Sequence, residues 1–234
     1  EGDEAYWNDI AEGFLSFSNI KGLYDQILFL DETGMEVMKV NFNDGKPYIA
    51  PKEQLQSKAK RSYFEDAFSL ERGEVYVSPF HLNIEEGNIE QPLKPIIHFG
   101  TPVFDSQGRK RGIILLNYLG AKLFYKLERA HIEAPDQFML HFMLHFMLLN
   151  SDGFWLKSPR AEDEWGFMYE GSNRTFGNVF PEAWRRISKA ESGQFHNADG
   201  MFTFATVHPL WEAQESSAGL GKAHEHSAGR LEAK

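Results

Sequence analysis

The first two dozen residues carry apolar side chains at spacings of three and four, the period of an amphipathic helix. The members of this stripe are Tyr6, Trp7, Ile10, Phe14, Phe17 and Ile20. The pattern predicts a helix over residues 1–23. Because the neighbouring sequence offers no second apolar helix, we expect the stripe to pack on elements that follow later in the chain.

After residue 23 the apolar period changes to two, which predicts strands joined by tight turns. One arrangement occurs four times: an apolar run, a four-residue turn that ends in Gly, and a second apolar run. The turns are 31–34, 105–108, 150–153 and, more weakly, 197–200. Asp, Asn and Gly suit such turns because they tolerate the backbone angles that a turn requires.

Between the first two hairpins the pattern predicts a helix over 52–68, a short strand at 75–77 and a strand at 96–99. The resulting order is strand, strand, helix, short strand, strand, strand. This order is typical of an antiparallel α+β lobe and not of a parallel βαβ fold. A further helix from 121 to about 131 leads to a second set of elements, which includes an amphipathic helix at 180–187.

Composition and charge remove several classes of function. The 234 residues carry a net charge of −10, and Lys and Arg form no stripe, so nucleic acid is not an expected partner. The absence of Cys excludes disulfides, thiolate metal sites and cysteine nucleophiles. No run reaches the ~20 apolar residues of a membrane span, and no signal peptide is visible. Since the chain also begins at Glu1, we expect a segment of a longer, membrane-anchored protein.

The sequence shows no catalytic or metal-binding constellation. It has no Gly-rich phosphate loop, nucleophile elbow or His-Glu metal helix. His141 and His145 stand four apart in a repeated Phe-Met-Leu-His sequence, but apolar residues surround them, so we interpret them as incidental to a duplication. Glu162, Asp163 and Glu164 lack the ligand spacing of a calcium loop and predict a solvated charged loop. We therefore expect no metal ion and no cofactor.

Four segments together resemble the double Cache, or PDC, sensor domains. They are 24–37, 61–64, 75–78 and 102–118. The resemblance implies an extracytoplasmic sensor of a histidine kinase, a chemoreceptor or a cyclic-dinucleotide enzyme. Two features depart from the family: Leu28 replaces an Arg that many relatives carry, and the amino-acid-binding signature of some Cache receptors is not evident. An amino-acid ligand is therefore not predicted.

The fold class implied is α+β, with a long N-terminal helix and two tandem PAS-like lobes, each an antiparallel sheet flanked by helices. The expected segments are a stalk helix (1–23), a membrane-distal lobe (24–120), a connecting helix (121–136), a membrane-proximal lobe (137–211) and a flexible loop or tail (212–234). The second lobe has few strands, so it is either incomplete or completed by residues after 234.

The resemblance places a ligand site in the distal lobe, between the sheet and the helix and loops that cover it. The candidate ligand-binding residues are Arg61, Tyr63, Tyr76, Ser78, His98 and Asn117. An Arg would hold an anionic group, and the hydroxyls would orient the ligand. The alternative is structural: Arg61 would be a solvated or ion-paired surface residue, and Tyr63 a core aromatic.

We predict the periplasmic, ligand-sensing part of an inner-membrane receptor, which binds a small molecule, catalyses no reaction and signals through its helices. The stripe on the first helix also allows a homodimer. Two alternatives stay open. A free periplasmic solute-binding protein is disfavoured because the striped first helix is typical of a stalk. An α+β enzyme is disfavoured because no group of catalytic residues assembles.

Overall fold

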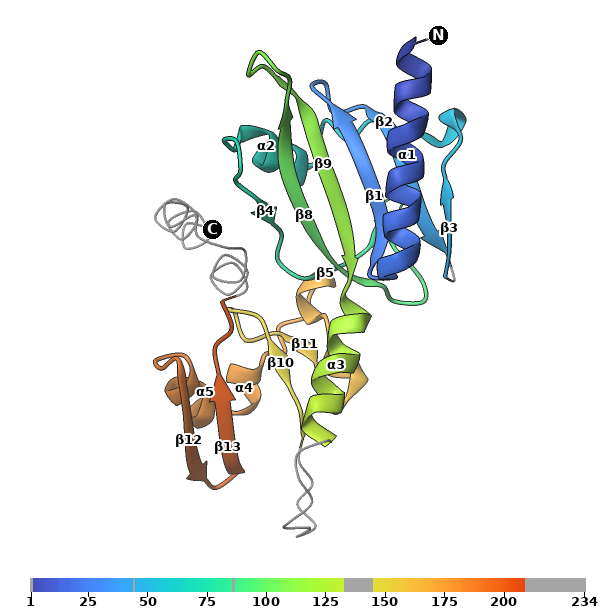
Figure 1. The fold of residues 1–234 in the computed structure, drawn as a ribbon. Coiled ribbons are helices and arrows are strands. Elements are labelled where there is room, and N and C mark those ends of the chain that lie inside the picture. The colour runs from blue at the N-terminus through green and yellow to red at the C-terminus, as the bar shows by residue number, and fades with distance from the viewer. Residues whose placement is uncertain (1, 44, 86, 133–144, 209–234) are drawn as a thin grey trace. The chain divides into compact units, whose positions relative to one another are not determined.

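The computed structural model describes residues 2–43, 45–85, 87–132 and 145–208 (Figure 1). The chain divides into two compact units, Glu1–Phe142 and Met143–Lys234. His141, most of the Phe-Met-Leu-His repeat, the end of the expected connecting helix and the expected tail all lie outside the described residues.

The first unit is built on an antiparallel sheet of seven strands in the order β3-β2-β1-β9-β8-β4, with β5 also paired to β8. The strands are β1 (Tyr24–Asp31), β2 (Glu36–Asn43), β3 (Lys46–Ile49), β4 (Tyr76–Val77), β5 (His81–Leu82), β8 (Pro95–Phe104) and β9 (Lys110–Leu119). The two long hairpins meet where β1 pairs with β9. The predicted antiparallel α+β class is confirmed, whereas β3 and the small hairpin of β6 (Ile84–Glu85) and β7 (Asn88–Ile89) were not predicted.

The two faces of this sheet bury different partners because side chains alternate along a strand. The helix α2 (Ser62–Ser69) covers one face and forms a core with β1 and β9. The buried members of that core are Leu28, Leu30, Phe64, Ala67, Ile113 and Leu115. The helix lies close to the sheet, because a Cβ at Gly100 on β8 would come within 2.8 Å of the Ala67 side chain.

The N-terminal helix α1 (Gly2–Lys21) lies on the opposite face (Figure 1). Trp7, Ile10 and Phe14 pack there against Phe29 and Met38 of the sheet. The predicted stripe is thus confirmed in its middle part, which packs on later elements of the chain.

The two ends of the apolar stripe are exposed, although the stripe was predicted to pack along its whole length. Tyr6 is 62% exposed and Ile20 is 79% exposed, while Phe17, 38% exposed, stacks on Tyr24. The helix is straight and the sheet is twisted, so the two surfaces diverge along their length. A stripe that spans about four turns therefore cannot contact the sheet at both of its ends.

The helix predicted over residues 52–68 is wrong in its first half. Only a 3-10 turn at Lys52–Gln54 and α2 at Ser62–Ser69 are helical. The intervening loop runs along β2 instead: the Gln56 carbonyl accepts from the Glu36 N–H, and the Lys58 N–H donates to the Gly34 carbonyl. These backbone bonds to a neighbouring strand replace the bonds that a continuous helix would have made.

Three of the predicted hairpin turns share one hydrogen-bond arrangement. In each, the first side chain is Asp or Asn and its Oδ1 accepts two backbone N–H groups of the turn, while the last residue is a Gly with positive φ. The turns begin at Asp31, Asp105 and Asn150 and end at Gly34, Gly108 and Gly153. This explains why Asp or Asn and Gly recur at a spacing of three.

The helix α3 (Gly120–Ile132) follows β9 directly, where the sequence predicted a helix. The second unit holds α4 (Phe176–Val179), α5 (Pro181–Ile187) and two small hairpins. The hairpins are β10 (Leu148–Leu149) with β11 (Trp155–Lys157), and β12 (Ser192–Asn197) with β13 (Gly200–Ala205). Trp155, Phe176 and Ala183 form the buried centre of its core. The predicted third and fourth hairpins and the helix at 180–187 are therefore confirmed.

The charged loop of the second unit differs from its predicted solvated state. Asp163 is only 4% exposed and pairs with the guanidinium groups of Arg160 and Arg174. Two cations with directed N–H donors offset the desolvation of one carboxylate. The loop is therefore anchored by an ion-paired cluster, which the sequence spacing did not reveal.

Candidate functional site

The α2-facing side of the sheet changes from apolar to polar along its central strands. On β1, Leu28 and Leu30 belong to the apolar core, and Gln26 precedes them at the next position on the same face. On β9, Leu115 is followed at the same spacing by Asn117, which is buried. These polar side chains lie on one face because they keep the period of two.

Gln26 and Asn117 form a continuous hydrogen-bonded row with Asn41 of β2 and His98 of β8, and we call these four side chains the amide ladder. Gln26 Nε2 donates to Asn41 Oδ1 at 3.1 Å, and Asn117 Nδ2 donates to Gln26 Oε1 at 2.9 Å. His98 Nδ1 lies 2.7 Å from Asn117 Oδ1. Asn41, His98 and Asn117 are buried, so the ladder satisfies polar groups that would otherwise cost stability.

His98 is the end of the ladder and the centre of an aromatic group. The Tyr63 ring of α2 lies 4.5 Å from the His98 ring, and the His81 ring of β5 lies 4.8 Å away. The Ser78 hydroxyl accepts from the His98 N–H and donates to the Pro79 carbonyl, both at 2.9 Å. Elements from both sides of β8 therefore hold this imidazole in place.

Burial changes the ionisation of this group. Together with a smaller effect of the nearby His81, it lowers the pKa of His98 to about 3. Burial also lowers the pKa of His81, and it raises the pKa of Tyr63 to about 12. All three side chains are consequently neutral near pH 7, which makes them hydrogen-bonding and stacking groups and not charges.

Cationic side chains lie around this neutral centre. Arg61 precedes α2 and is exposed, and both Arg61 and Lys58 act electrostatically on His98. The buried Glu36 carboxylate lies 3.5 Å from Lys58 Nζ and 4.0 Å from Lys39 Nζ, and it accepts the Gln56 N–H at 2.9 Å. The Glu36 carboxylate is thus already paired with two lysines, and the net charge of the side chains around His98 is positive.

The structure brings together four of the six predicted site residues. Tyr63, Ser78, His98 and Asn117 contact one another through the bonds and ring contacts around His98. Arg61 lies at the start of α2, two residues before Tyr63. Tyr76 packs instead against the apolar core under α2, where burial and then Asp66 raise its pKa. Their roles in ligand binding stay predictions.

Three members of this group were missed in the sequence. Gln26 and Asn41 carried a usable signal, because each is a polar residue at an inward position of an apolar strand. His81 carried none, since β5 has two residues and its place beside β8 depends on the folded chain.

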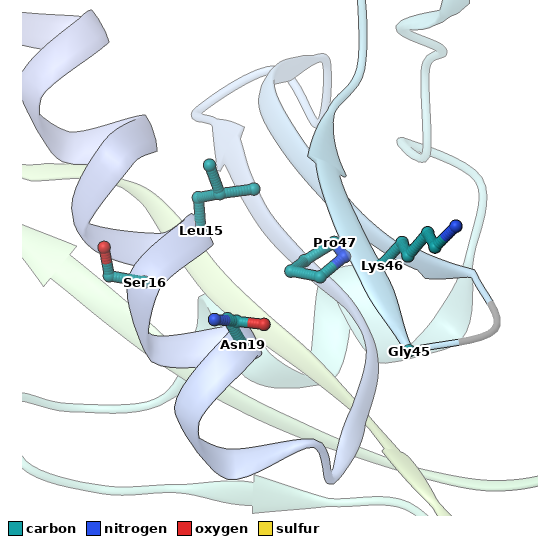
Figure 2. A pocket seen from close by; sticks show the side chains of 6 residues that line it. All are labelled: Leu15, Ser16, Asn19, Gly45, Lys46 and Pro47. Atoms are coloured by element: carbon teal, nitrogen blue, oxygen red, sulfur yellow. The ribbon is translucent and has the colours of Figure 1, made fainter.

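A separate hollow lies between α1 and the start of β3, as Figure 2 shows. Its lining residues are Leu15, Ser16, Asn19, Gly45, Lys46 and Pro47. Since α1 occupies the face of the sheet opposite to α2, this hollow does not belong to the amide ladder. Lys46 is its one charged side chain, so it offers little chemistry for specific recognition.

Metal chemistry finds no support in the described part of the chain, where no group of three or more His, Asp or Glu side chains could hold an ion. The predicted incidental pair His141 and His145 cannot be placed, because His141 lies outside the described residues.

A family profile described as "Bacterial histidine kinase, sensor domain" matches residues 3–216. No curated protein matches the chain. Within the described ranges, no helix is both long and apolar enough to span a membrane.

Three solved structures show the same fold. A domain assigned to the sensory box/GGDEF family from Vibrio parahaemolyticus is 22% identical with a TM-score of 0.76, over 89% of this chain and 75% of that one. The extracellular domain assigned to histidine kinase vpHK1S-Z8 is 22% identical with a TM-score of 0.75, over 88% and 71%. The ligand-binding domain of Campylobacter jejuni chemoreceptor Tlp3, in complex with L-valine, is 9% identical with a TM-score of 0.51, over 83% and 65%.

Proposed function

Because the chain belongs to the family of bacterial histidine kinase sensor domains, we propose that its first unit binds a small molecule at the polar cluster around His98. The chain is the extracytoplasmic sensor part of a membrane-bound receptor and is not catalytic. The carrying observation is the amide ladder, which places buried hydrogen-bonding groups beside exposed Arg61.

The composition of the cluster supports recognition of a ligand. Ligand sites combine aromatic walls with a few oriented polar groups. Tyr63 and His81 supply the aromatic walls, His98 and Asn117 supply oriented polar atoms, and Arg61 supplies a cation without an ion pair to any described residue.

We further propose that the chain forms two PAS-like lobes, a distal one over 24–120 and a proximal one over 137–211, with α1 as the stalk. Strand β1 offers the link between ligand and stalk. Gln26 belongs to the amide ladder on one face, and Phe29 on the other face lies 5.0 Å from the Trp7 ring of α1. A ligand that prefers one arrangement of β1 would shift the population of α1 positions by that difference in affinity.

The exposed part of the α1 stripe supports a homodimer. Positions 6, 13, 17 and 20 follow one another at spacings of seven, four and three, as on the seam of a coiled coil, while Ile10 between them packs on the sheet. Tyr6, Phe17 and Ile20 on this seam are exposed. A Cβ at Gly13 would meet nothing within 4 Å, so a second helix has room to approach. A second copy of the chain is the occupant that this seam fits.

A thermal-shift screen tests the proposed ligand site. A ligand at ~100 times its dissociation constant adds about 2.7 kcal/mol of stability. At ~2–4 °C per kcal/mol for a chain of this size, the melting temperature should rise by roughly 5–10 °C. Arg61→Ala should abolish that rise, and Tyr169→Ala in the second unit, at a half-exposed Tyr, should leave it intact. A rise lost only in Tyr169→Ala would place the site in the second unit.

A further inference from the structure

A second hollow lies on the α1 side of the sheet, between α1 and the turns of the two long hairpins. We call it the α1 hollow, and its lining includes Trp7, Phe29, Asp31 and Glu32. Its volume is about 360 Å³, within the range of small-molecule sites. Since α2 covers the opposite face of the sheet, the α1 hollow is separate from the polar cluster around His98. It also shares no lining residue with the hollow of Figure 2.

The wall of the α1 hollow is apolar and partly aromatic. The Trp7 ring of α1 lies 5.0 Å from the Phe29 ring of β1, and Val103 and Ile114 line the hollow from β8 and β9. Tyr6 also lines it, with its ring 5.8 Å from the Trp7 ring. Such a wall favours an apolar ligand body, and aromatic faces also attract a cation.

Three carboxylates line the α1 hollow, and they differ in their partners. Asp105 binds Arg109 at 2.8 Å, and Glu32 lies 3.7 Å from Arg111. Asp31 forms no ion pair with any residue in the ranges that the structure describes. Arg111 is the one basic side chain that lines the hollow. One negative charge, that of Asp31, is therefore not compensated.

The carboxylate of Asp31 is held in a fixed position by its own turn. Its Oδ1 accepts the N–H groups of Thr33 and Met35 at 2.8 and 3.0 Å. Partial burial raises the pKa of this carboxyl, but hydrogen bonds from Thr33, Met35 and Gly34 outweigh that effect and hold the pKa below its usual value. Asp31 is consequently ionised near pH 7 and presents an oriented anion to the hollow.

The charge of the hollow disfavours two other occupants. An anionic ligand would be repelled by Asp31. The first turn of α1 in a second copy of the chain carries Glu1, Asp3 and Glu4, so it would be repelled as well.

We propose that the α1 hollow binds a small amphipathic amine, whose ammonium faces Asp31 and whose apolar body lies against Trp7 and Phe29. This second site goes beyond the ligand site proposed around His98. Its ligand contacts α1 and both hairpins, so an amine that prefers one position of α1 on the sheet would shift the population toward it.

Three compounds with one apolar body and different head groups provide the test. Phenethylamine, 2-phenylethanol and 3-phenylpropionate each carry a phenyl ring on two methylenes, followed by an ammonium, a hydroxyl or a carboxylate. In calorimetric titration of the whole chain near pH 7, the amine should bind about fivefold or more tightly than either of the others, the effect of one ion-paired hydrogen bond.

The variant Asp31→Asn removes the charge and keeps the turn. The chain itself shows that Asn serves at this position, because Asn150 Oδ1 accepts the N–H groups of Asp152 and Phe154 in the third hairpin turn. Asp31→Asn should remove the preference for the amine. Asp9→Asn, the same change of charge at an exposed position of α1 that does not line the hollow, should preserve it.

The outcomes separate this inference from the proposed function. Equal or weaker binding of the amine, binding by none of the three compounds, or a preference that persists in Asp31→Asn would each overturn the amine site. Amine binding that is lost in Arg61→Ala and kept in Asp31→Asn would also overturn it, because the compound would then occupy the polar cluster. The ligand site around His98 has its own test in the thermal-shift screen, and its failure would leave the amine site standing.

Discussion

The buried His98 makes the stability of the protein depend on pH. Its pKa is about 3 in the folded protein, mainly because of burial, against an ordinary value of 6.5. Between these values the unfolded chain binds a proton that the folded chain does not. The free energy of unfolding therefore falls as the pH is lowered below about 6.5. Near pH 5 this one residue should have removed about 2 kcal/mol.

The variant His98→Gln isolates that contribution, because Gln can still donate to Asn117 but does not titrate. Urea unfolding at about pH 7 and pH 5 should show the wild-type chain losing about 2 kcal/mol more than the variant. Equal losses would mean that His98 has the same pKa in the folded and the unfolded chain, and that the amide ladder does not bury it as described.

The same residue shows how far the sequence alone reaches. His98 and Asn117 were both predicted as site residues, but their contact depends on register. Near the turn, Phe104 pairs with Lys110, and continuing that register would set His98 opposite Leu116. A bulge between Val103 and Phe104 shifts the pairing by one and brings Asn117 opposite His98. Nothing in the residue pattern marks the bulge, yet a one-residue slip moves every side chain to the other face.

At the scale of elements, one substitution tests the packing of α1 on the sheet through Trp7, Ile10 and Phe14. Phe14→Asp would place a charge between α1 and Phe29, and we expect it to lower the free energy of unfolding by about 3 kcal/mol. Ser16→Asp, the same charge on the exposed side of the helix, should change it by less than about 0.5 kcal/mol. Urea unfolding of both variants gives the comparison, and equal stabilities would contradict the packing of α1.

Helices and strands with a clear repeat of apolar residues could be predicted from the sequence. Segments whose conformation depends on hydrogen bonds to distant parts of the chain could not. The hairpin turns at 31–34 and 105–108 follow from local chemistry that Asp and Gly supply within four residues. The segment 52–68 failed because its backbone bonds to β2 are tertiary. The short strands β5, β6 and β7 failed for a related reason, since two residues carry no period.

At the scale of the whole molecule, dimerisation can be tested at the exposed end of the α1 seam. Ile20 is 79% exposed, so Ile20→Asp should leave the folded protomer intact. In a coiled-coil dimer the same charge would face its copy across the seam and weaken association by at least about tenfold. Sedimentation velocity over a range of concentrations measures this. A wild-type chain that stays monomeric throughout, or a variant that associates equally well, would contradict the proposed homodimer.

The central claim is that a small ligand binds at the polar cluster of the first unit, and chemical-shift mapping of its backbone amides tests this most directly. When a compound found in the thermal-shift screen is titrated into the nitrogen-15-labelled chain, the largest changes should fall on Tyr63, Ser78, His98 and Asn117. These residues come from α2, β8, β9 and the segment between β4 and β5, so changes confined to them would mark one shared site. Changes concentrated in residues 145–208 would contradict the account.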